Sequence, residues 1–465
     1  MSEIEKILQE CTECNVCVEE CEFLKQACET PKELADRFKA GYFREKPQIP
    51  YSCNLCDLCE KLCPQDLNIG KMCLEIRQQM VKEGSGPLSE HKKFVVKEQE
   101  WVSSDAFSLY LPDLTTDKCQ RVFFPGCILS GYSPSLVLKT YDYLREKLPD
   151  TGIILGCCGA PTLELGEEAG FKEMLAGLDS KMRKLGAKEI TLACPYCYHT
   201  FKQYAPQLQP KSLYEVMAEV GLPETVKNSE RVFSLHDSCK TRWEKSLQDS
   251  VRILISEMGH RIEEMEYSKD KTRCCGAGSF ISFADSDLAK NVTKRRAGEF
   301  PFDILTYCAT CRETLVQEKP AIHILDLIFN PDWEKDRLKP PSKALNLRAN
   351  QSLLKAKLQV EYERLKGVAV SSQDYERVKL QKSAEVTEAL KSKHILDDEV
   401  KIVIHHAEST GEKLYQLESN KFLAKKRIGE REEYKVTFYV EYSVAGENAY
   451  TVHNAYYHEP KILED

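Results

Sequence analysis

A pattern of five cysteines occurs twice in the middle of this 465-residue chain. Each copy has a single cysteine, a Cys-Cys-Gly triplet and a Cys-x-x-Cys pair, and corresponding cysteines lie 112, 117 and 114 residues apart. The two sets are Cys127, Cys157, Cys158, Cys194 and Cys197, and Cys239, Cys274, Cys275, Cys308 and Cys311. Five thiols exceed the four that one zinc ion or one cubane cluster requires. The pattern therefore indicates a duplicated domain, and it favours iron–sulfur chemistry in which the cluster is a reaction site.

Composition limits the functional class. A length of 465 residues predicts two to four domains, and a net charge of −8 argues against a general nucleic-acid binder. No apolar stretch approaches 18 residues, so we expect no membrane span and, for any work at a membrane, a membrane partner. The charged start lacks a secretory apolar region, which predicts a cytoplasmic protein. There, 21 cysteines indicate metal ligands before disulfides.

Two further runs of four cysteines lie near the N-terminus, and the second run ends in Cys63-Pro64. Their spacing is typical of proteins with two cubane [4Fe–4S] clusters, in which the fourth cysteine of each run ligates the other cluster. The predicted ligand sets are Cys11, Cys14, Cys17 and Cys63 for cluster one, and Cys53, Cys56, Cys59 and Cys21 for cluster two. A pair of zinc sites is the alternative, but zinc modules usually present pairs of ligands separated by a longer loop.

The sequence around these two runs predicts helices. Pro31 suits a first helical turn and Gly41 suits the C-terminal cap of the same helix. A second helix is predicted over residues 68–82, before a Gly-Ser-Gly-Pro stop. We therefore expect residues 1–86 to form a helical two-cluster ferredoxin module, followed by a linker over residues 87–120.

Strand-like apolar stretches precede the cysteines of the duplicated pattern and alternate with helical stretches. The stretches are 121–124, 152–155 and 189–192 in the first copy, and 231–235 and 302–305 in the second. This alternation predicts α/β domains with mainly parallel sheets over residues 121–229 and 230–332. Sites in such sheets gather at the carboxyl ends of the strands, so the five thiols of one copy are expected to converge there.

These motifs carry a family resemblance. Phe-Phe-Pro-Gly-Cys127, Cys157-Cys158-Gly159 and Cys194-Pro-Tyr-Cys197, together with their repeat, resemble the cysteine-rich CCG domains of heterodisulfide reductases. Related domains occur in iron–sulfur subunits of glycolate, lactate and glycerol-3-phosphate dehydrogenases. A ferredoxin module followed by two CCG domains is similar to the fused catalytic subunit of the membrane-associated heterodisulfide reductase, over roughly residues 1–330.

The resemblance implies a function. Each five-cysteine set would hold a noncubane [4Fe–4S] cluster, so the chain would contain up to two. Electrons would come from a flavoprotein partner that holds the flavin, and would pass through the two cubane clusters to the CCG domains. There a small disulfide would bind between the two clusters and be cleaved to thiols, or be formed in reverse.

Other interpretations remain open at this point. One or both five-cysteine sets would hold a cubane cluster if the chain only conducts electrons. It would then be the iron–sulfur subunit of a hydroxy-acid or glycerol-3-phosphate type dehydrogenase that passes electrons toward quinone. A zinc-binding assembly scaffold is the third interpretation, which two complete five-cysteine sets argue against.

A few residues fall outside these ligand sets. Cys28, Cys73 and Cys119 remain, and buried apolar packing is their expected role, with Cys119 the candidate substitute ligand. His236, close to Cys239, is a candidate proton donor, although a structural histidine is the alternative. His199 is a candidate for hydrogen bonding to a cluster.

The C-terminal third is predicted to have two parts. The polar residues 333–394 favour a solvated helical linker over a docking arm for a partner. Residues 395–465 predict a small α+β domain, with a short helix and strand-like alternation at 422–428, 434–443 and 449–458. Its histidines, for which ordinary surface or core roles are expected, are His405, His406, His453 and His458. Docking to another subunit is the simplest hypothesis for this domain.

Overall fold

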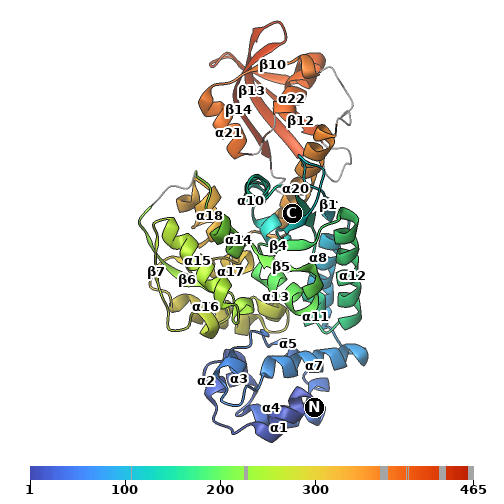
Figure 1. The fold of residues 1–465 in the computed structure, drawn as a ribbon, viewed down its shortest axis with the longest axis vertical. Helices are drawn as coiled ribbons and strands as arrows, with labels where there is room; N and C mark the ends of the chain where they lie inside the picture. The colour runs from blue at the N-terminus through green and yellow to red at the C-terminus, as the bar shows by residue number, and fades with distance from the viewer. Residues whose placement is uncertain are drawn as a thin grey trace.

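The computed structural model describes residues 1–105, 107–224, 229–366, 375–393, 395, 397–428 and 436–458. A helical N-terminal module lies at one end of the molecule, two α/β domains lie side by side in the middle, and a sheet domain lies at the other end (Figure 1). The multidomain architecture expected from the sequence is therefore confirmed. No helix of the described residues has both the length and the apolar character needed to cross a bilayer.

The N-terminal module consists of short helices around the two cysteine runs. They are α1 (Glu3–Glu10), α2 (Val16–Glu19), α3 (Glu22–Ala27), α4 (Pro31–Lys39), α5 (Gln48–Tyr51), α6 (Leu58–Leu62) and α7 (Ile69–Lys82). The side chain of Thr30 caps α4 by accepting from the backbone N–H of Glu33, and Asn68 caps α7 in the same way. Ile7, Leu34 and Met72 are fully buried in the core of the module.

The first α/β domain contains a five-stranded sheet with the order β1-β3-β2-β4-β5. Its strands are β1 (Leu109–Leu111), β2 (Arg121–Phe124), β3 (Thr151–Leu155), β4 (Glu189–Leu192) and β5 (Pro210–Ser212). Strands β2 to β5 are parallel, whereas β1 is antiparallel to β3 and comes from the predicted linker. Leu109 and Leu111 are buried on the sheet and Tyr110 faces outward, so burial of an alternating apolar pair draws this stretch into the domain.

The second α/β domain repeats this arrangement without the extra strand. Its sheet has the order β7-β6-β8-β9, with all pairings parallel. The strands are β6 (Val232–His236), β7 (Arg261–Glu263), β8 (Ile304–Thr306) and β9 (Ala321–His323). The order of β7-β6-β8-β9 matches that of β3-β2-β4-β5, so the duplication seen in the sequence extends to the topology.

Helices cover both sheets. In the first domain they are α9 (Cys127–Tyr132), α10 (Pro134–Lys147), α11 (Ala160–Glu164), α12 (Glu168–Leu185), α13 (Pro195–Tyr204) and α14 (Leu213–Val220). In the second they are α15 (Lys245–Glu257), α16 (Ser286–Gly298), α17 (Ala309–Leu315) and α18 (Ile324–Phe329), followed by α19 (Trp333–Asp336). A π-helical turn at His91–Val96 leads into α8 (Lys97–Ser103), which joins the N-terminal module to the first domain.

The predicted solvated linker contains a helix that packs on the first α/β domain. Helix α20 (Ala344–Leu365) lies against α9, and its Leu354 and Leu358 are fully buried. The Gln351 amide donates to the Cys127 carbonyl at 2.9 Å and accepts from the Trp101 indole at 3.0 Å. The expectation of a solvated linker is thus wrong here, because these leucines extend the domain core and Gln351 supports the backbone of a motif cysteine.

The C-terminal domain is a five-stranded sheet with helices on one face. Its strand order is β10-β14-β13-β12-β11, and only the β10–β14 pairing is parallel. The elements are β10 (Lys379–Gln381), α21 (Ala384–Ser392), α22 (Asp397–Thr410), β11 (Lys413–Gln416), β12 (Lys421–Ile428), β13 (Val436–Gly446) and β14 (Ala449–His458). The predicted strand at 434–443 begins in residues 434–435, which lie outside the described residues. The observed β10 falls in the predicted helical linker.

Buried cationic side chains hold the N-terminal module against both α/β domains. Arg77 of α7 is fully buried and donates to the carbonyls of Pro50 and Cys53 in its own module, at 2.8 and 2.7 Å. Its guanidinium also donates to the Glu164 carbonyl of the first α/β domain at 2.8 Å and to the Ser279 hydroxyl of the second. One side chain therefore joins three parts of the molecule.

We predict that replacing Arg77 with methionine will lower the free energy of unfolding by at least about 3 kcal/mol, because buried carbonyls lose charged donors. The measurement is urea unfolding of the anaerobically purified chain. Arg44→Met is the matched control, since Arg44 pairs with Glu83 on the surface of the same module. Equal unfolding midpoints for the two variants would contradict the structural role of Arg77.

Candidate metal centres

The first five-cysteine set lies where the strands of the first α/β domain end. Cys127 follows β2 and begins α9, Cys157 and Cys158 follow β3, and the Cys194–Cys197 pair follows β4 at the start of α13. The five thiols follow one another in the order Cys127, Cys157, Cys158, Cys197, Cys194, and each lies close enough to the next to shift its pKa. The carboxyl ends of neighbouring parallel strands thus bring together all five predicted side chains.

Each of these five thiols shifts the pKa of a neighbouring thiol. Hydrogen bonding to Cys127 and Cys158 holds the pKa of Cys157 well below its ordinary value. Hydrogen bonding to Cys157, together with burial, holds the pKa of Cys127 well above its ordinary value. The sulfurs therefore titrate as a unit. Holding all five as thiolates requires a compensating positive charge, which a metal centre supplies.

Gly126 is needed where the first set is most crowded. Its φ is +83°, in the region that favours glycine, and a Cβ there would lie 3.0 Å from the Cβ of Cys194 and 3.4 Å from the Cys197 sulfur. A side chain at this position would occupy the space between the sulfurs. The chain thus keeps its backbone close to the thiols.

The second set repeats these contacts. The thiols follow one another in the order Cys239, Cys274, Cys275, Cys311, Cys308, each close enough to the next to shift its pKa, and this order corresponds residue by residue to the first set. The Gly276 N–H donates to the Cys274 sulfur at 3.4 Å, as the Gly159 N–H does to Cys157 at the same distance. Hydrogen bonding to Cys274 and Cys311 lowers the pKa of Cys275 to about 5. Unlike Cys157, Cys274 follows a loop and not a strand.

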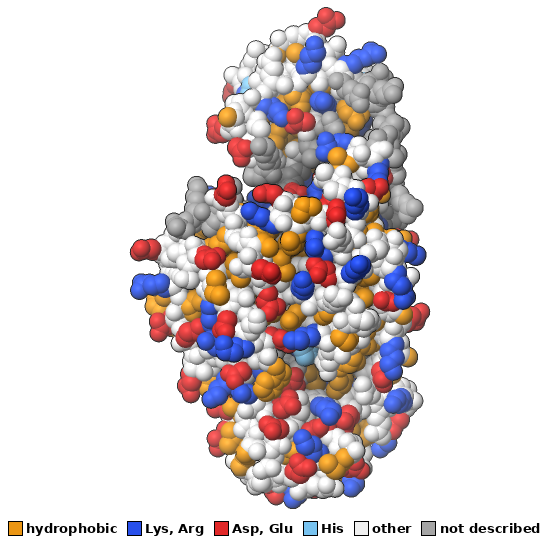
Figure 2. Space-filling view, in the orientation of Figure 1, with side chains coloured by type: hydrophobic (Ala, Val, Ile, Leu, Met, Phe, Trp, Pro, Cys, Tyr) orange, Lys and Arg blue, Asp and Glu red, His pale blue; other side chains and the backbone are white. Residues whose placement is uncertain are grey.

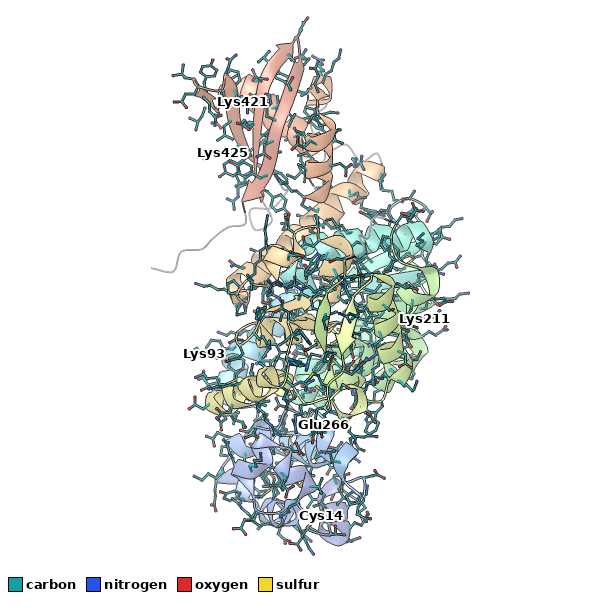
Figure 3. The ribbon with its side chains drawn as sticks, turned by 90° about the vertical axis from the view of Figure 1, so that its left-hand side faces the viewer. Cys14, Lys93, Lys211, Glu266, Lys421 and Lys425 are labelled. Atoms are coloured by element: carbon teal, nitrogen blue, oxygen red, sulfur yellow. The ribbon has the colours of Figure 1, made fainter. Side chains whose placement is uncertain are left out.

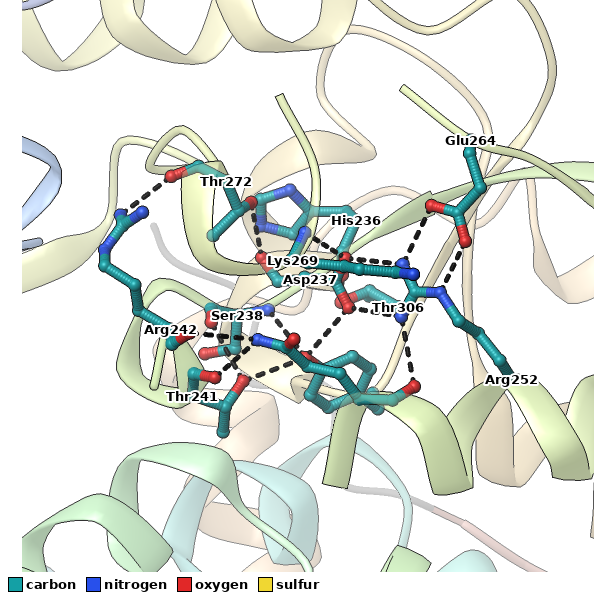
Figure 4. A network of polar contacts seen from close by, with 12 residues as sticks. His236, Asp237, Ser238, Thr241, Arg242, Arg252, Glu264, Lys269, Thr272 and Thr306 are labelled. Atoms are coloured by element: carbon teal, nitrogen blue, oxygen red, sulfur yellow. Dashed lines mark hydrogen bonds and ion pairs between the residues drawn. The ribbon is translucent and has the colours of Figure 1, made fainter. Parts of the chain in front are cut away.

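A buried network around Asp237 holds the loops that carry the second set (Figure 4). The two Asp237 carboxylate oxygens accept from Arg252 of α15 at 3.1 and 2.9 Å. They also accept from the Lys269 backbone N–H at 2.8 Å and from the Tyr307 hydroxyl at 3.2 Å. Asp237 therefore links the segments before Cys239, Cys274 and Cys308. The sequence signal for this role was an acid next to the strand end, but its partners are far away in the chain.

In the N-terminal module the cysteines form two groups. Burial and the nearby Cys63, Cys11 and Cys14 raise the pKa of Cys17 to about 12. Burial and the nearby Cys56 and Cys53 raise the pKa of Cys21 to about 12 as well. Burial and the nearby Cys53 and Cys56 also hold the pKa of Cys59 well above its ordinary value. The fourth cysteine of each run thus lies beside the other run, in the arrangement that the exchanged-ligand pattern predicts.

The two groups differ in position. Cys14 is exposed at the outer end of the module, away from the α/β domains (Figure 3). The other group consists of Cys21, Cys53, Cys56 and Cys59, which all line one cavity. Cys274 of the second α/β domain also lines this cavity. Burial and the nearby Cys239 raise the pKa of Cys56 to about 12. The second group therefore adjoins the second five-cysteine set.

The spacing of these thiols tests which metal group fits. Within the described part of the chain, one group of three metal-ligating side chains has its ligand atoms within 4.8 Å of one another. This group consists of His236, Cys275 and Cys311. A tetrahedral zinc site, with zinc–sulfur bonds of about 2.3 Å, places its sulfurs about 3.8 Å apart. The four-thiol groups of the N-terminal module are more open, so their donor set fits a larger iron–sulfur core.

The three remaining cysteines have different surroundings. Cys119 precedes β2, at the opposite end of the strand from Cys127, and its thiol donates to the Arg121 carbonyl at 3.2 Å. It is therefore not placed as a substitute ligand. The thiol of Cys73 hydrogen-bonds to Cys53, a contact that the sequence pattern did not indicate because Cys73 lies within the helical stretch of α7. The Cys28 thiol donates to the Leu24 carbonyl at 3.6 Å.

His236 and His199 are both desolvated. Burial, reinforced by the Arg296 charge, lowers the pKa of His236 to about 3. Burial, reinforced by the Lys240 charge, lowers the pKa of His199 to about 4. A neutral imidazole is a weak acid, so this environment argues against His236 as an imidazolium proton donor. Two of the C-terminal histidines have local partners: His406 contacts Glu412 and His453 contacts the Ser443 hydroxyl.

Comparison with known protein families agrees with this organisation. Residues 10–68 match a 4Fe-4S dicluster domain, and residues 121–202 and 233–316 each match a cysteine-rich domain. The matches begin and end close to the N-terminal module and the two α/β domains. No solved structure matches the chain.

Several curated proteins are similar to the chain. A subunit of the dihydromethanophenazine:CoB–CoM heterodisulfide reductase of Methanosarcina mazei is 24% identical over 375 residues, which cover 68% of this chain and 90% of the relative. A subunit of the fumarate reductase (CoM/CoB) of Methanothermobacter marburgensis is 24% identical over 345 residues, 66% of this chain and 67% of the relative. EtfAB:quinone oxidoreductase of Syntrophomonas wolfei is 22% identical over 302 residues, 56% of this chain and 42% of the relative. The chain therefore contains a 4Fe-4S dicluster domain followed by two cysteine-rich CCG domains, and it is similar to a subunit of a heterodisulfide reductase.

Proposed function

We propose that this chain takes electrons from a flavoprotein partner and reduces a small disulfide to two thiols, or forms the disulfide in reverse. Reduction consumes two electrons, which the partner supplies, and two protons. The observation that carries the proposal is that both five-thiol sets are complete, with the first set half-buried to buried and the second fully buried, and that they face one polar junction. Clusters bound by these thiols would supply electrons and sites that stabilise thiolate sulfur.

The junction is built from residues of both CCG domains. Lys240, next to Cys239, donates to the Glu164 carboxylate of the first domain at 2.7 Å and to the Leu55 carbonyl of the N-terminal module at 2.9 Å. The Lys240 ammonium also lies 4.7 Å from the centre of the Tyr196 ring. This ion pair is buried between the two CCG domains.

Tyr196 lies near thiols of both sets. Glu164, Cys239 and Cys158 all act, together with burial, to hold its pKa well above the ordinary value, so it stays a protonated phenol. Its hydroxyl lies near the Glu164 carboxylate, but neither the hydroxyl nor the second carboxylate oxygen makes a hydrogen bond of good geometry, although both atoms are buried. Unpaired buried polar groups of this kind are costly, and they are expected where a ligand completes the hydrogen bonding. A sulfur of the bound substrate is the acceptor that we assign to the Tyr196 hydroxyl.

The position of the N-terminal module indicates the order in which electrons would pass through the chain. The cluster-one thiols include the exposed Cys14 at the outer end, which suits contact with a partner. The cluster-two thiols adjoin Cys239 and Cys274, so electrons would reach the second CCG domain before the first. Acidic and basic side chains are interspersed on the face drawn in Figure 2, without a single-sign surface there of the kind that nucleic-acid binding requires. We expect the chain to work in the cytoplasm, with a membrane partner for any membrane acceptor.

An electron conduit is the second candidate function. In this case the chain would be the iron–sulfur subunit of a hydroxy-acid or glycerol-3-phosphate type dehydrogenase and would pass electrons toward quinone. The similarity to an EtfAB:quinone oxidoreductase favours it. A conduit requires filled clusters but no response to thiols, which separates it from disulfide reduction.

We predict about 16 iron atoms and about 16 sulfides per anaerobically purified chain, from four four-iron clusters. Replacing Cys275 with alanine removes a thiol of the second set and should lower the iron content to about 12. Cys119→Ala, at a buried cysteine outside the sets, should leave the content unchanged. A wild-type value near about 8 would mean that only the N-terminal module is loaded, which would remove the basis for disulfide chemistry.

We also predict that small thiols will change the paramagnetic signal of the oxidised protein. Tyr196→Phe should raise the thiol concentration for a half-maximal change about fivefold, as expected for the loss of one hydrogen bond worth about 1 kcal/mol. Tyr198→Phe is the control in the same helix, since the Tyr198 hydroxyl is directed toward Glu215. A signal that stays unaltered at saturating thiol would favour the conduit.

A further inference from the structure

His236 distinguishes the second five-cysteine set from the first. It is the last residue of β6, three residues before Cys239, and its side chain is fully buried. A ring nitrogen of His236 and the sulfurs of Cys275 and Cys311 all lie within 4.8 Å of one another. The equivalent position in the first domain is Phe124, which packs against Phe201 and has no hydrogen-bonding group.

Arg296 decides which tautomer His236 adopts. The Arg296 Nε–H donates to His236 Nδ1 at 3.2 Å. Arginine has no acceptor atom, so Nδ1 must offer its lone pair. The hydrogen of the neutral ring is then on Nε2, which cannot bind a metal while it carries that hydrogen. Nε2 is buried without a partner, and it is therefore the free hydrogen-bond donor of the ring.

Other contacts hold the ring in this orientation. Arg296 is 1% exposed, and its guanidinium is anchored by the Glu299 carboxylate at 2.6 Å. Phe300 packs edge-on against the imidazole with a centroid distance of 6.0 Å. The Thr306 hydroxyl of the neighbouring strand donates to the His236 carbonyl at 3.1 Å. A buried unpaired donor held this firmly beside two thiols indicates a specific acceptor.

We propose that His236 is a positioning residue whose Nε2–H donates a hydrogen bond to sulfur at the second CCG centre and makes that centre easier to reduce. Donors to the sulfurs of an iron–sulfur cluster stabilise the reduced, more negative state and raise the reduction potential. The proposal rests on the part of the proposed function that places a cluster in the second set, and it does not require a disulfide substrate. The first set has a donor of another kind, the Gln99 amide at 3.7 Å from the Cys157 sulfur.

The location gives this residue a role in electron flow. The cluster-two thiols share a cavity with Cys274, so the second centre is the acceptor nearest to the N-terminal module. A higher potential there favours transfer out of the cubane clusters. His236 thus acts through the centre and does not touch substrate in this proposal.

The test is a redox titration of anaerobically purified full-length protein, followed by electron paramagnetic resonance. His236→Phe reproduces the first-domain residue. It should keep about 16 iron atoms and lower the reduced-to-oxidised ratio of the second centre about tenfold at a fixed potential, a shift of about 59 mV for a one-electron couple. His236→Gln retains an acceptor and an N–H donor, and it should restore most of the shift. An unchanged potential in a fully loaded His236→Phe protein would overturn the proposal.

A second measurement uses the wild-type chain, in case the variants fail to assemble. Protein labelled with ¹⁵N-histidine should show a weak nitrogen coupling and an exchangeable proton coupling at the second centre. A strong nitrogen coupling would identify His236 as a ligand and would overturn the hydrogen-bond role, as would the absence of any coupling. None of these readouts contains a disulfide, so a failed thiol response with a normal His236 effect would count against the proposed function alone.

Discussion

The arrangement of the redox sites depends on buried cations that satisfy the carbonyls of the second N-terminal cysteine run. Arg77 binds the Cys53 carbonyl, Lys240 binds that of Leu55, and Arg242 binds that of Cys56 at 2.9 Å. A loop wrapped around a metal group has neither helix nor strand to pair its own carbonyls, and leaving them unpaired in the interior is costly. Charged donors supply strong hydrogen bonds there. Because Lys240 and Arg242 belong to the second CCG domain, the same bonds fix that domain against the cluster-two thiols.

Duplication produced two sites with the same sulfur contacts and different neighbours. The order in which the thiols neighbour one another is the same in both sets, and glycine N–H groups donate to equivalent sulfurs. The surroundings differ: Phe124 corresponds to His236, Pro125 to Asp237 and Ile128 to Lys240. The polar residues are concentrated on the second copy, which faces the N-terminal module. The first copy instead contributes Tyr196, where the second has Thr310. The two sites thus have the same thiols in different polar surroundings.

This asymmetry suits a centre that receives single electrons and a junction that uses them in pairs. Thiols of cluster two and of the second set share a cavity, while Lys240, Glu164 and Tyr196 lie between the two CCG domains. The ion pair is nearly fully buried, and such pairs are seldom the most stable choice for a core. Under the proposed function, this ion pair would help to arrange a substrate between the sites.

The sequence by itself predicted which cysteines belong together and determined the duplication, because ligand spacing and repeats are local patterns that need no tertiary information. The same patterns predicted the exchange of Cys21 and Cys63 between the two runs and the convergence of thiols at strand ends. Only the tertiary structure decided the partners of Asp237, His236 and Tyr196, the contact of Cys73 with Cys53, and the packing of α20 on the first CCG domain. These contacts join residues that are up to hundreds of positions apart in the sequence. The identity of a side chain does not indicate its distant partner, because the partner is set only when folding buries both groups together.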